Sequence, residues 1–300
     1  MRVLAFLAML PVAAQAGGLE VQPVTDNVWA LVGEKEQRSP SNFANNATFG
    51  LVVTDEGVVL IDPGGSWKGA EEIHATIKGL TDQPVAVVIN TGGQDHRWLG
   101  NGYWLAQGAQ VIASDAAVED HYARGHMQMM ALTQFLGDAL AGTVPAYATT
   151  TFDADYSFDH GGVTFQITHP GGAHTPGDSF VWVPSKDTVF TGDIVYVERI
   201  LGLGDQSSII TWPAAFEAME ATGATHVVPG HGHATTMDHA RAETFDYLMN
   251  LRAVVGALID AGGDLSQAAD VDQSGFSTLE QFGSLARKNA EVAFRQMEFE

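Results

Sequence analysis

Short apolar runs separated by turn residues dominate the hydrophobic pattern of the chain. Runs of four to eight apolar residues between glycine, proline, asparagine or aspartate are typical of buried β-strands. In the first half of the chain they predict strands over residues 28–32, 47–54, 58–62, 85–89 and 110–113. In the second half they predict strands over residues 149–158, 163–168, 179–183, 188–191 and 225–228.

Helices are predicted between these strands. Ser66 follows a Pro-Gly-Gly turn and is a suitable N-cap for a helix that extends to about Leu80. Further helices are predicted over residues 98–106, 116–141, 212–222 and 234–261. The chain then continues into a loop and a final helix.

The predicted elements follow the order strands, helix, strand, helix, and this order occurs twice. It favours an α/β protein in which two sheets pack face to face with helices outside, a four-layer αβ/βα sandwich. We expect residues 17–261 to form this domain. Residues 262–300 are expected to form a C-terminal helical tail packed on the same domain.

The N-terminus has the pattern of a secretory signal peptide. Arg2 supplies a positive charge, an apolar run follows it, and residues 14–16 are a small-x-small cleavage pattern. The run is too short to span a bilayer. We therefore expect residues 1–16 to be removed and the mature protein to be periplasmic or secreted, with no membrane anchor after cleavage.

The charge balance restricts the possible partners. The chain has 14 basic and 36 acidic residues and a formal net charge of −22, so it repels nucleic-acid backbones and anionic membranes. We expect a small-molecule substrate, and the acidic character favours a neutral or cationic one. Because the chain has no cysteine, histidine, aspartate or glutamate must hold any metal ion.

Candidate metal ligands lie at the ends of predicted strands. Asp95 and His96 follow the strand 85–89 after two glycines, in the type of loop where rigid scaffolds carry functional side chains. Three more lie at later strand ends within glycine- or proline-rich turns: His174, Asp193 and His231. Imidazoles and carboxylates that converge on one edge of a sandwich predict a zinc site.

Four motifs carry a resemblance to a known family. They are Val-Val-Leu-Ile-Asp at 58–62, Ala-His-Thr-Pro-Gly-Asp at 173–178, Thr-Gly-Asp at 191–193 and Pro-Gly-His-Gly at 229–232. From about residue 21 to the C-terminus the chain resembles the metallo-β-lactamase-fold superfamily, especially its periplasmic branch linked to sulfur oxidation and quinoprotein systems. The resemblance implies an αβ/βα sandwich with one or two metal ions, usually zinc, at the edge of the sheets.

The chain departs from this family after the strand 85–89, where the family pattern is Thr-His-x-His-x-Asp-His. Here residues 92–94 are Gly-Gly-Gln, and two alignments fit the flanking anchors. In an ungapped alignment, glycine and glutamine replace the two histidines, His96 replaces the aspartate, and Arg97 replaces the last histidine. In a gapped alignment, Asp95 and His96 keep the roles of the Asp-His pair.

Both alignments imply that the first metal site of the family is lost, because only His174 remains of its three imidazoles. In the gapped alignment four residues would hold the second site: Asp95, His96, Asp193 and His231. In the ungapped alignment His96, Asp193 and His231 would form a triad, beside the adverse positive charge of the arginine. A triad of two histidines and one carboxylate suits zinc, iron or manganese.

The first functional hypothesis is an exported hydrolase with a single-metal site, acting through metal-activated water on an ester, lactone, thioester or amide-type substrate. Asp95 would be a ligand or general base, and His174 a ligand or a donor to the developing oxyanion. His233 would orient a ligand or line the site. The lost imidazoles favour an alternative, a non-hydrolytic metal-binding or partner protein that keeps the fold. The broken first site and the resemblance to another branch disfavour β-lactam hydrolysis.

Overall fold

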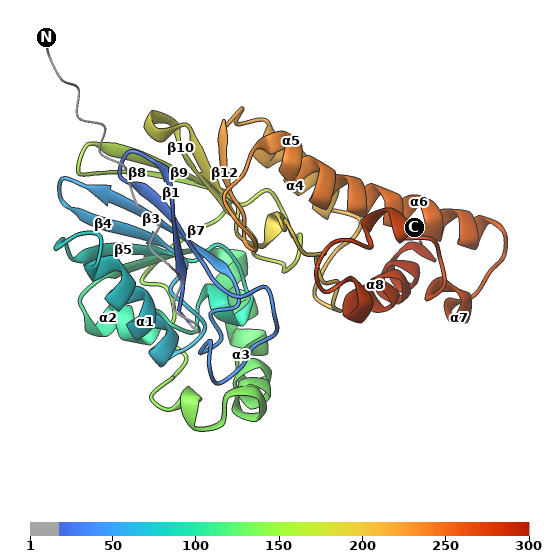
Figure 1. The fold of residues 1–300 in the computed structure, drawn as a ribbon, viewed down its shortest axis with the longest axis horizontal. Helices are drawn as coiled ribbons and strands as arrows, with labels where there is room; N and C mark the ends of the chain where they lie inside the picture. The colour runs from blue at the N-terminus through green and yellow to red at the C-terminus, as the bar shows by residue number, and fades with distance from the viewer. Residues whose placement is uncertain (1–17, 300) are drawn as a thin grey trace, which may run out of the picture.

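The computed structural model describes residues 18–299 and contains two β-sheets with helices on their outer faces (Figure 1). The predicted α/β sandwich with a helical C-terminal region is therefore confirmed. The predicted signal peptide, residues 1–16, lies outside the described residues.

The first half of the chain forms a seven-stranded sheet whose strands lie side by side in chain order. Strands β1 to β4 pair antiparallel, and β4 to β7 pair parallel because crossover segments containing helices connect them. The strands are β1 (Glu20–Thr25), β2 (Val28–Val32), β3 (Thr48–Thr54), β4 (Gly57–Ile61), β5 (Val85–Ile89), β6 (Gln110–Ser114) and β7 (Thr150–Phe152). The edge strand β1 mixes polar and apolar residues, and its side chains are exposed or half-buried, so it lacks the continuous apolar run that marks the other strands.

The second half forms a five-stranded sheet of order β12-β11-β10-β9-β8. Its strands are β8 (Asp155–His160), β9 (Val163–Thr168), β10 (Phe180–Val183), β11 (Thr188–Phe190) and β12 (His226–Val228). The prediction of one strand over residues 149–158 was wrong, because the chain bends at residues 153–154 and crosses from the first sheet to the second. The bend falls on Asp153 and Ala154, and aspartate and alanine are both depleted in strands, so the sequence carries a local signal for it that the apolar pattern alone does not include.

The two sheets enclose the central core between them. Val52 and Ile89 from the first sheet are buried with Phe165 and Val181 from the second. Burying each such side chain fully contributes about 1.5–3 kcal/mol. The outer face of the first sheet packs under α1 and α2. Residues of the second sheet share one buried cluster with α4, to which α6 and α8 add further out. The order of layers is thus helix, sheet, sheet, helix.

The helices are α1 (Trp67–Lys78), α2 (Asn101–Ala106), α3 (Asp115–Leu136), α4 (Trp212–Glu220), α5 (Met237–Ala240), α6 (Asp246–Asp260), α7 (Leu265–Ala268) and α8 (Phe282–Met297). Ser66 caps α1 as predicted, because its hydroxyl accepts a hydrogen bond of 3.0 Å from the backbone N–H of Gly69. The helix predicted over 234–261 begins later and contains a π-helical turn (Arg241–Phe245) between α5 and α6.

The C-terminal segment packs on the same core through α8. Ala290, Ala293 and Phe294 are buried in one cluster with Leu251 and Val255 of α6. Figure 1 shows α6, α7 and α8 together at one end of the molecule, beyond the sheets. Across residues 18–299, no helix combines the length and apolar character that a membrane span requires.

Candidate metal centre

Three buried side chains from separate strand ends meet where the two sheets adjoin. His96 lies in a 3₁₀ turn after β5, Asp193 lies in a 3₁₀ turn after β11, and His231 lies in the turn after β12. One potential ligand atom of each residue lies within 4.8 Å of those of the other two. The sequence-based expectation that these strand ends converge agrees with this geometry.

The distances within this cluster fit a metal ion. His96 Nε2 lies 3.3 Å from Asp193 Oδ2, and His231 Nε2 lies 3.2 Å from Asp193 Oδ1. Ligand atoms about 2.0 Å from a tetrahedral zinc ion are themselves about 3.3 Å apart. Two imidazoles and one carboxylate therefore fit one divalent ion, and the same distances also permit hydrogen bonds to the carboxylate.

Arg97 lies fully buried beneath the cluster and joins two carboxylates. Its Nη2 donates to Asp193 Oδ1 at 2.7 Å, and its Nη1 donates to Asp62 Oδ2 at 2.8 Å. Two backbone carbonyls accept further hydrogen bonds from the guanidinium. Burial alone would raise the pKa of Asp193, but Arg97 and His96 outweigh burial and hold it well below its usual range. Asp193 is therefore ionised.

Asp95 does not join the cluster and instead contacts Arg38. Its carboxylate accepts hydrogen bonds from Arg38 Nε at 2.6 Å and Nη2 at 2.5 Å. Burial would raise the pKa of Asp95, but Arg38 and His96 hold it well below its usual range. Asp95 is thus an ionised carboxylate behind the His96 ring and not one of the three clustered residues, which are those of the ungapped alignment's triad.

Two charged groups lie behind the His96 ring, on the side of Nδ1. Asp95 Oδ1 lies 3.2 Å from Nδ1, and Arg38 Nη2, which can only donate, lies 3.4 Å from the same nitrogen. Nε2 lies on the other side, within hydrogen-bond distance of Asp193 Oδ2; a metal ion on Nε2 would require that nitrogen to be unprotonated, with the proton on Nδ1 facing Asp95. A carboxylate behind the ring is the common arrangement for metal-binding histidines.

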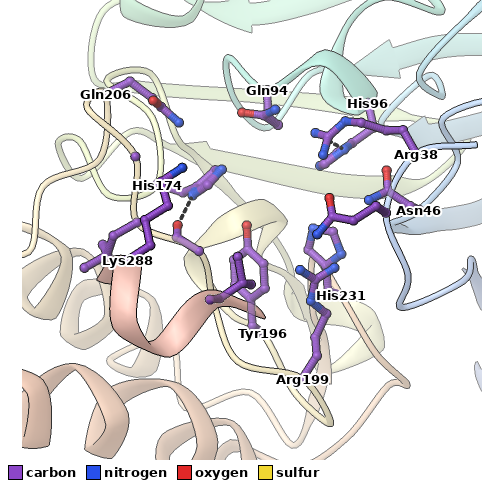
Figure 2. Close-up of a pocket in the computed structure, with 15 residues that line it drawn as sticks. Arg38, Asn46, Gln94, His96, His174, Tyr196, Arg199, Gln206, His231 and Lys288 are labelled. Carbon is purple, nitrogen blue, oxygen red and sulfur yellow. Dashed lines mark hydrogen bonds between the residues drawn. The ribbon is translucent and has the colours of Figure 1, made fainter. Parts of the chain in front are cut away.

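A cavity of about 150 Å³ opens beside the cluster. It is lined by Gln37, Arg38, Asn46, Gln94, His96, His174, Tyr196, Arg199, Gly202, Leu203, Gly204, Gln206, His231, Leu285 and Lys288. Figure 2 shows His174 across the cavity from His96 and His231, with the Tyr196 hydroxyl pointing between them. A second cavity of about 580 Å³ shares Arg38 and Gln94 with the first, so the two adjoin.

His174 faces the cavity but stands apart from the cluster. Its Nδ1 lies 3.0 Å from the carbonyl oxygen of Gly202. Because a carbonyl only accepts, Nδ1 carries the proton and Nε2 presents a lone pair. Burial lowers the pKa of His174 to about 4, so the ring is neutral at pH 7.

Other side chains occupy the space that a side chain at residue 92 or 93 would need. A Cβ at Gly92 would lie 2.3 Å from Asp178 Oδ1, and a Cβ at Gly93 would lie 1.7 Å from Asp120 Oδ2. Helix α3 also holds these glycines through Gln128, which donates to the carbonyl of Gly93 at 2.8 Å. In this structure the loop therefore has no room for an imidazole at residue 92 or 93.

We expect that restoring the family pattern by Gly92→His with Gln94→His does not rebuild the first site. The side chain at 92 would collide with Asp178, and such overpacking costs about 1–3 kcal/mol. Thermal unfolding and metal analysis would check this. Gln94→His alone is the control, since Gln94 lines the cavity and has room. A second bound metal ion in the double variant would contradict the expectation.

His233 lies outside the cavity lining and contacts two carboxylates. Its Nδ1 lies 2.9 Å from Glu198, and its Nε2 lies 3.2 Å from Glu20. Partial burial lowers the pKa of His233, but these carboxylates outweigh burial and raise it. The structure gives it no direct contact with His96, Asp193 or His231 that would orient a ligand.

Several cavity residues were not singled out from the sequence. Tyr196 stacks on His231 with ring centroids 4.5 Å apart, and Arg199 lies near it in the loop after Asp193. Both residues follow shortly after the Thr-Gly-Asp motif at 191–193. This proximity was the one signal in the sequence that could have placed them at the site. Lys288 comes from α8, far along the chain, and no local pattern connects it with this site.

The comparisons with known proteins agree with this fold. The profile of the Metallo-beta-lactamase superfamily matches residues 44–236, and the chain belongs to this superfamily. The metallo-beta-lactamase type 2 of Elizabethkingia meningoseptica is 27% identical over 225 residues, 71% of this chain and 78% of that protein. Relatives with this fold are hydrolases that typically bind zinc, which together with the cluster indicates a metal-dependent hydrolase.

Solved structures give the same result. A metallo-beta-lactamase from Pontibacter korlensis is 25% identical with a TM-score of 0.63, covering 77% of this chain and 99% of that chain. The metallo-beta-lactamase IND-7 is 21% identical with a TM-score of 0.59, covering 76% and 97%. The likeness to IND-7 supports the fold and no statement about activity.

Proposed function

We propose that the protein is an exported hydrolase with a single metal ion held by His96, Asp193 and His231. The observation that carries this proposal is the convergence of three potential ligand atoms within 4.8 Å, beside a cavity. Zinc is the expected metal because proteins of this fold typically bind it, and the donor set also suits iron or manganese. The proposed substrate is an ester, lactone, thioester or amide.

The metal would supply Lewis-acid chemistry, lowering the pKa of a water molecule and polarising a carbonyl oxygen. The side chains around it would hold the ligands in place. Asp95 orients the His96 ring, and the stacked Tyr196 ring fixes the plane of His231. Arg97 keeps Asp193 ionised.

His174 is assigned to orientation of the attacking water. Its Nε2 carries a lone pair because Nδ1–H donates to Gly202, so Nε2 accepts a hydrogen bond from water rather than donating one to an oxyanion. The donor to the oxyanion would then be Tyr196. Burial and the nearby Asp193 raise the pKa of its phenol well above the usual value, so its hydroxyl keeps the proton it would donate.

Arg97 supports a second candidate function, a non-hydrolytic metal-binding or partner protein. Its guanidinium already neutralises Asp193 at 2.7 Å, so the cluster is electrostatically stable without a metal ion. The same charge also repels a divalent cation and weakens its binding. Under this alternative the fold persists while turnover is absent.

Metal analysis of the mature protein and a hydrolysis screen would separate the two functions. We expect about one zinc ion per chain, following the one cluster found within residues 18–299, and turnover of an ester, lactone or thioester. The screen includes a β-lactam because the relatives carry that name. Stoichiometric metal without turnover would favour the alternative, and no metal after reconstitution would exclude the proposed hydrolase.

Export and the sulfur-oxidation branch are part of this proposal and rest on the sequence. Fractionation of cells that produce the full chain tests export, with N-terminal sequencing of the mature protein at residue 17 as the expected result. A mature protein that still begins at Met1 in the cytoplasm would exclude the signal peptide.

A further inference from the structure

His96 is carried on a short turn that follows two glycines. The turn comprises the 3₁₀ residues Asp95–Arg97, and Gly92 and Gly93 lie just before it. Glycine loses more backbone freedom on folding than any other residue, so two in succession raise the entropic cost of ordering this loop. Contacts from elsewhere in the fold must therefore hold His96 opposite Asp193.

The side chain of Gln128 on helix α3 joins the two ends of this turn. Its Nε2 donates to the backbone carbonyl of Gly93 at 2.8 Å, and its Oε1 accepts from the indole Nε1 of Trp98 at 2.9 Å. Gly93 lies two residues before the turn, and Trp98 follows it directly. A carbonyl only accepts and an indole N–H only donates, so these partners fix the orientation of the amide. One side chain thus forms a clamp around the residues that carry His96.

The two hydrogen bonds of this clamp require an amide. Glutamine presents a donor and an acceptor at the end of one side chain, whereas an ionised glutamate only accepts and methionine has no N–H or O–H group. Gln128 is 8% exposed, and Trp98 is fully buried. Without the amide the indole N–H would be left buried and unpaired, which is costly.

Two more side chains of α3 hold the segment before the turn. Arg124 Nη2 donates to the carbonyl of Gly93 at 3.1 Å, and His121 Nε2 lies 3.0 Å from the carbonyl of Gly92. Because a carbonyl only accepts, His121 Nε2 carries the proton. Residues 121, 124 and 128 are three and four positions apart, so they share one face of the helix. This face of α3 is directed at the loop that carries His96.

Helix α3 also approaches Trp98 closely. A Cβ at Gly125 would lie 3.0 Å and 3.2 Å from two ring carbons of Trp98, so a larger residue there would crowd the indole. Glycine inside a helix is destabilising relative to alanine, and here it gives the indole room beside the helix. The ring of His121 stacks on the same indole with ring centroids 4.4 Å apart. The indole that Gln128 binds is therefore itself held firmly.

We propose that Gln128 is a positioning residue that holds His96 Nε2 opposite Asp193 before any metal ion binds. Because the clamp has already ordered the turn, a metal ion binds without having to order it, and its affinity rises accordingly. Gln128 acts through the backbone of the turn rather than as a ligand. The inference deepens the proposed function and rests on its metal site, since it assigns the preorganisation of one ligand to α3.

Gln128→Met tests the clamp, because it keeps the length of the side chain and removes both hydrogen bonds. We expect this variant to bind zinc about tenfold more weakly than the wild type, the lower end of the effect of residues that support metal ligands. Competition with a chromophoric chelator measures the affinity under conditions where circular dichroism shows each variant to be folded. The visible absorption of the cobalt-loaded protein should also change, because it reports the geometry of the ligands.

Two control variants separate positioning from general loss of stability. Gln134→Met makes the same substitution at an exposed position of α3 outside the lining of both cavities. Val255→Ala removes buried methyl groups from the cluster under α6, which contains no residue of the turn. Both should keep the zinc affinity and cobalt spectrum of the wild type.

Gln128→Glu is the conservative variant of the same position. It keeps the length and the acceptor, but its carboxylate cannot donate to Gly93, so it should resemble Gln128→Met. Equal zinc affinity in folded Gln128→Met and Gln134→Met, or an equal loss in Val255→Ala, would overturn the clamp.

Hydrogen exchange in the metal-free protein separates this inference from the hydrolase proposal. The amides of Arg97 and Leu99 are hydrogen-bonded within the turn at 2.8 Å and 2.9 Å, and we expect Gln128→Met to speed their exchange about tenfold relative to Gln134→Met. If no zinc binds but exchange differs in this way, the clamp stands and the hydrolase proposal fails. If zinc binds and esters are hydrolysed, but neither affinity nor exchange depends on Gln128, the hydrolase proposal stands and the clamp fails.

Discussion

Replacing His231 by alanine is expected to abolish hydrolysis and metal binding together. His231 provides one of three potential ligand atoms that lie within 4.8 Å of one another. Mutating a residue that hydrogen-bonds to a metal ligand already lowers metal affinity by about 10–100-fold. Removing the ligand itself should therefore lower metal affinity by at least about 100-fold. Metal content after dialysis and kcat/KM on the best substrate of the screen would be measured in parallel.

A surface histidine provides the control for this experiment. His239 is half exposed and pairs with Glu243 at 3.2 Å, so His239→Ala should keep both metal and turnover. His231→Asn, whose amide occupies part of the lost volume, distinguishes loss of the ligand from loss of the fold, which circular dichroism monitors. Full metal content and turnover in folded His231→Asn would show that the cluster does not hold the metal.

Replacing Arg97 by methionine is expected to produce the largest loss of stability. The guanidinium joins Asp62 and Asp193 at 2.8 and 2.7 Å, and all three side chains are buried. Breaking a buried ion pair on one side costs about 3–5 kcal/mol, because a buried charge is left uncompensated. Urea unfolding of the metal-free protein would measure the loss. Domains have about 5–15 kcal/mol of stability, so the variant should still fold.

The same variant should gain more stability from zinc than the wild type does. Without the guanidinium, Asp193 has no fixed counter-cation and becomes the stronger ligand, and a ligand that binds the native state stabilises it. Arg287→Gln is the control, because its exposed pair with Asp270 contributes at most about 1 kcal/mol. A loss for Arg97→Met no larger than that of the control would contradict a structural role for the buried pair.

The fold could be predicted largely because its strands are local apolar runs. Strands β2, β5 and β9 have the predicted bounds, since each is flanked by turn residues that end the run. The break between β7 and β8 was missed because the strand prediction followed the strand-forming residues on both sides of it. The bend at Asp153 and Ala154, two residue types depleted in strands, separates parts that join different sheets. β1 was missed because its side chains are exposed or half-buried and it has no continuous apolar run.

The register of Asp95 and His96 shows why the candidate site could be predicted only in part. The sequence placed both residues in one loop after β5, and both alignments kept its anchors. Two long-range contacts select between them: Arg38 binds Asp95, and Asp193 faces His96. Neither partner lies near the loop in sequence, so no local pattern contains this information.

The sequence by itself predicted the sandwich and His174, Asp193 and His231 as strand-end candidates, and the loss of the first metal site remains a prediction of the family resemblance. These follow from residue type and from order along the chain. Only the tertiary structure decided that Asp95 supports His96, that Arg97 lies between two carboxylates, and that Lys288 enters the cavity. Such contacts join segments far apart in the sequence, and packing of the whole domain fixes them.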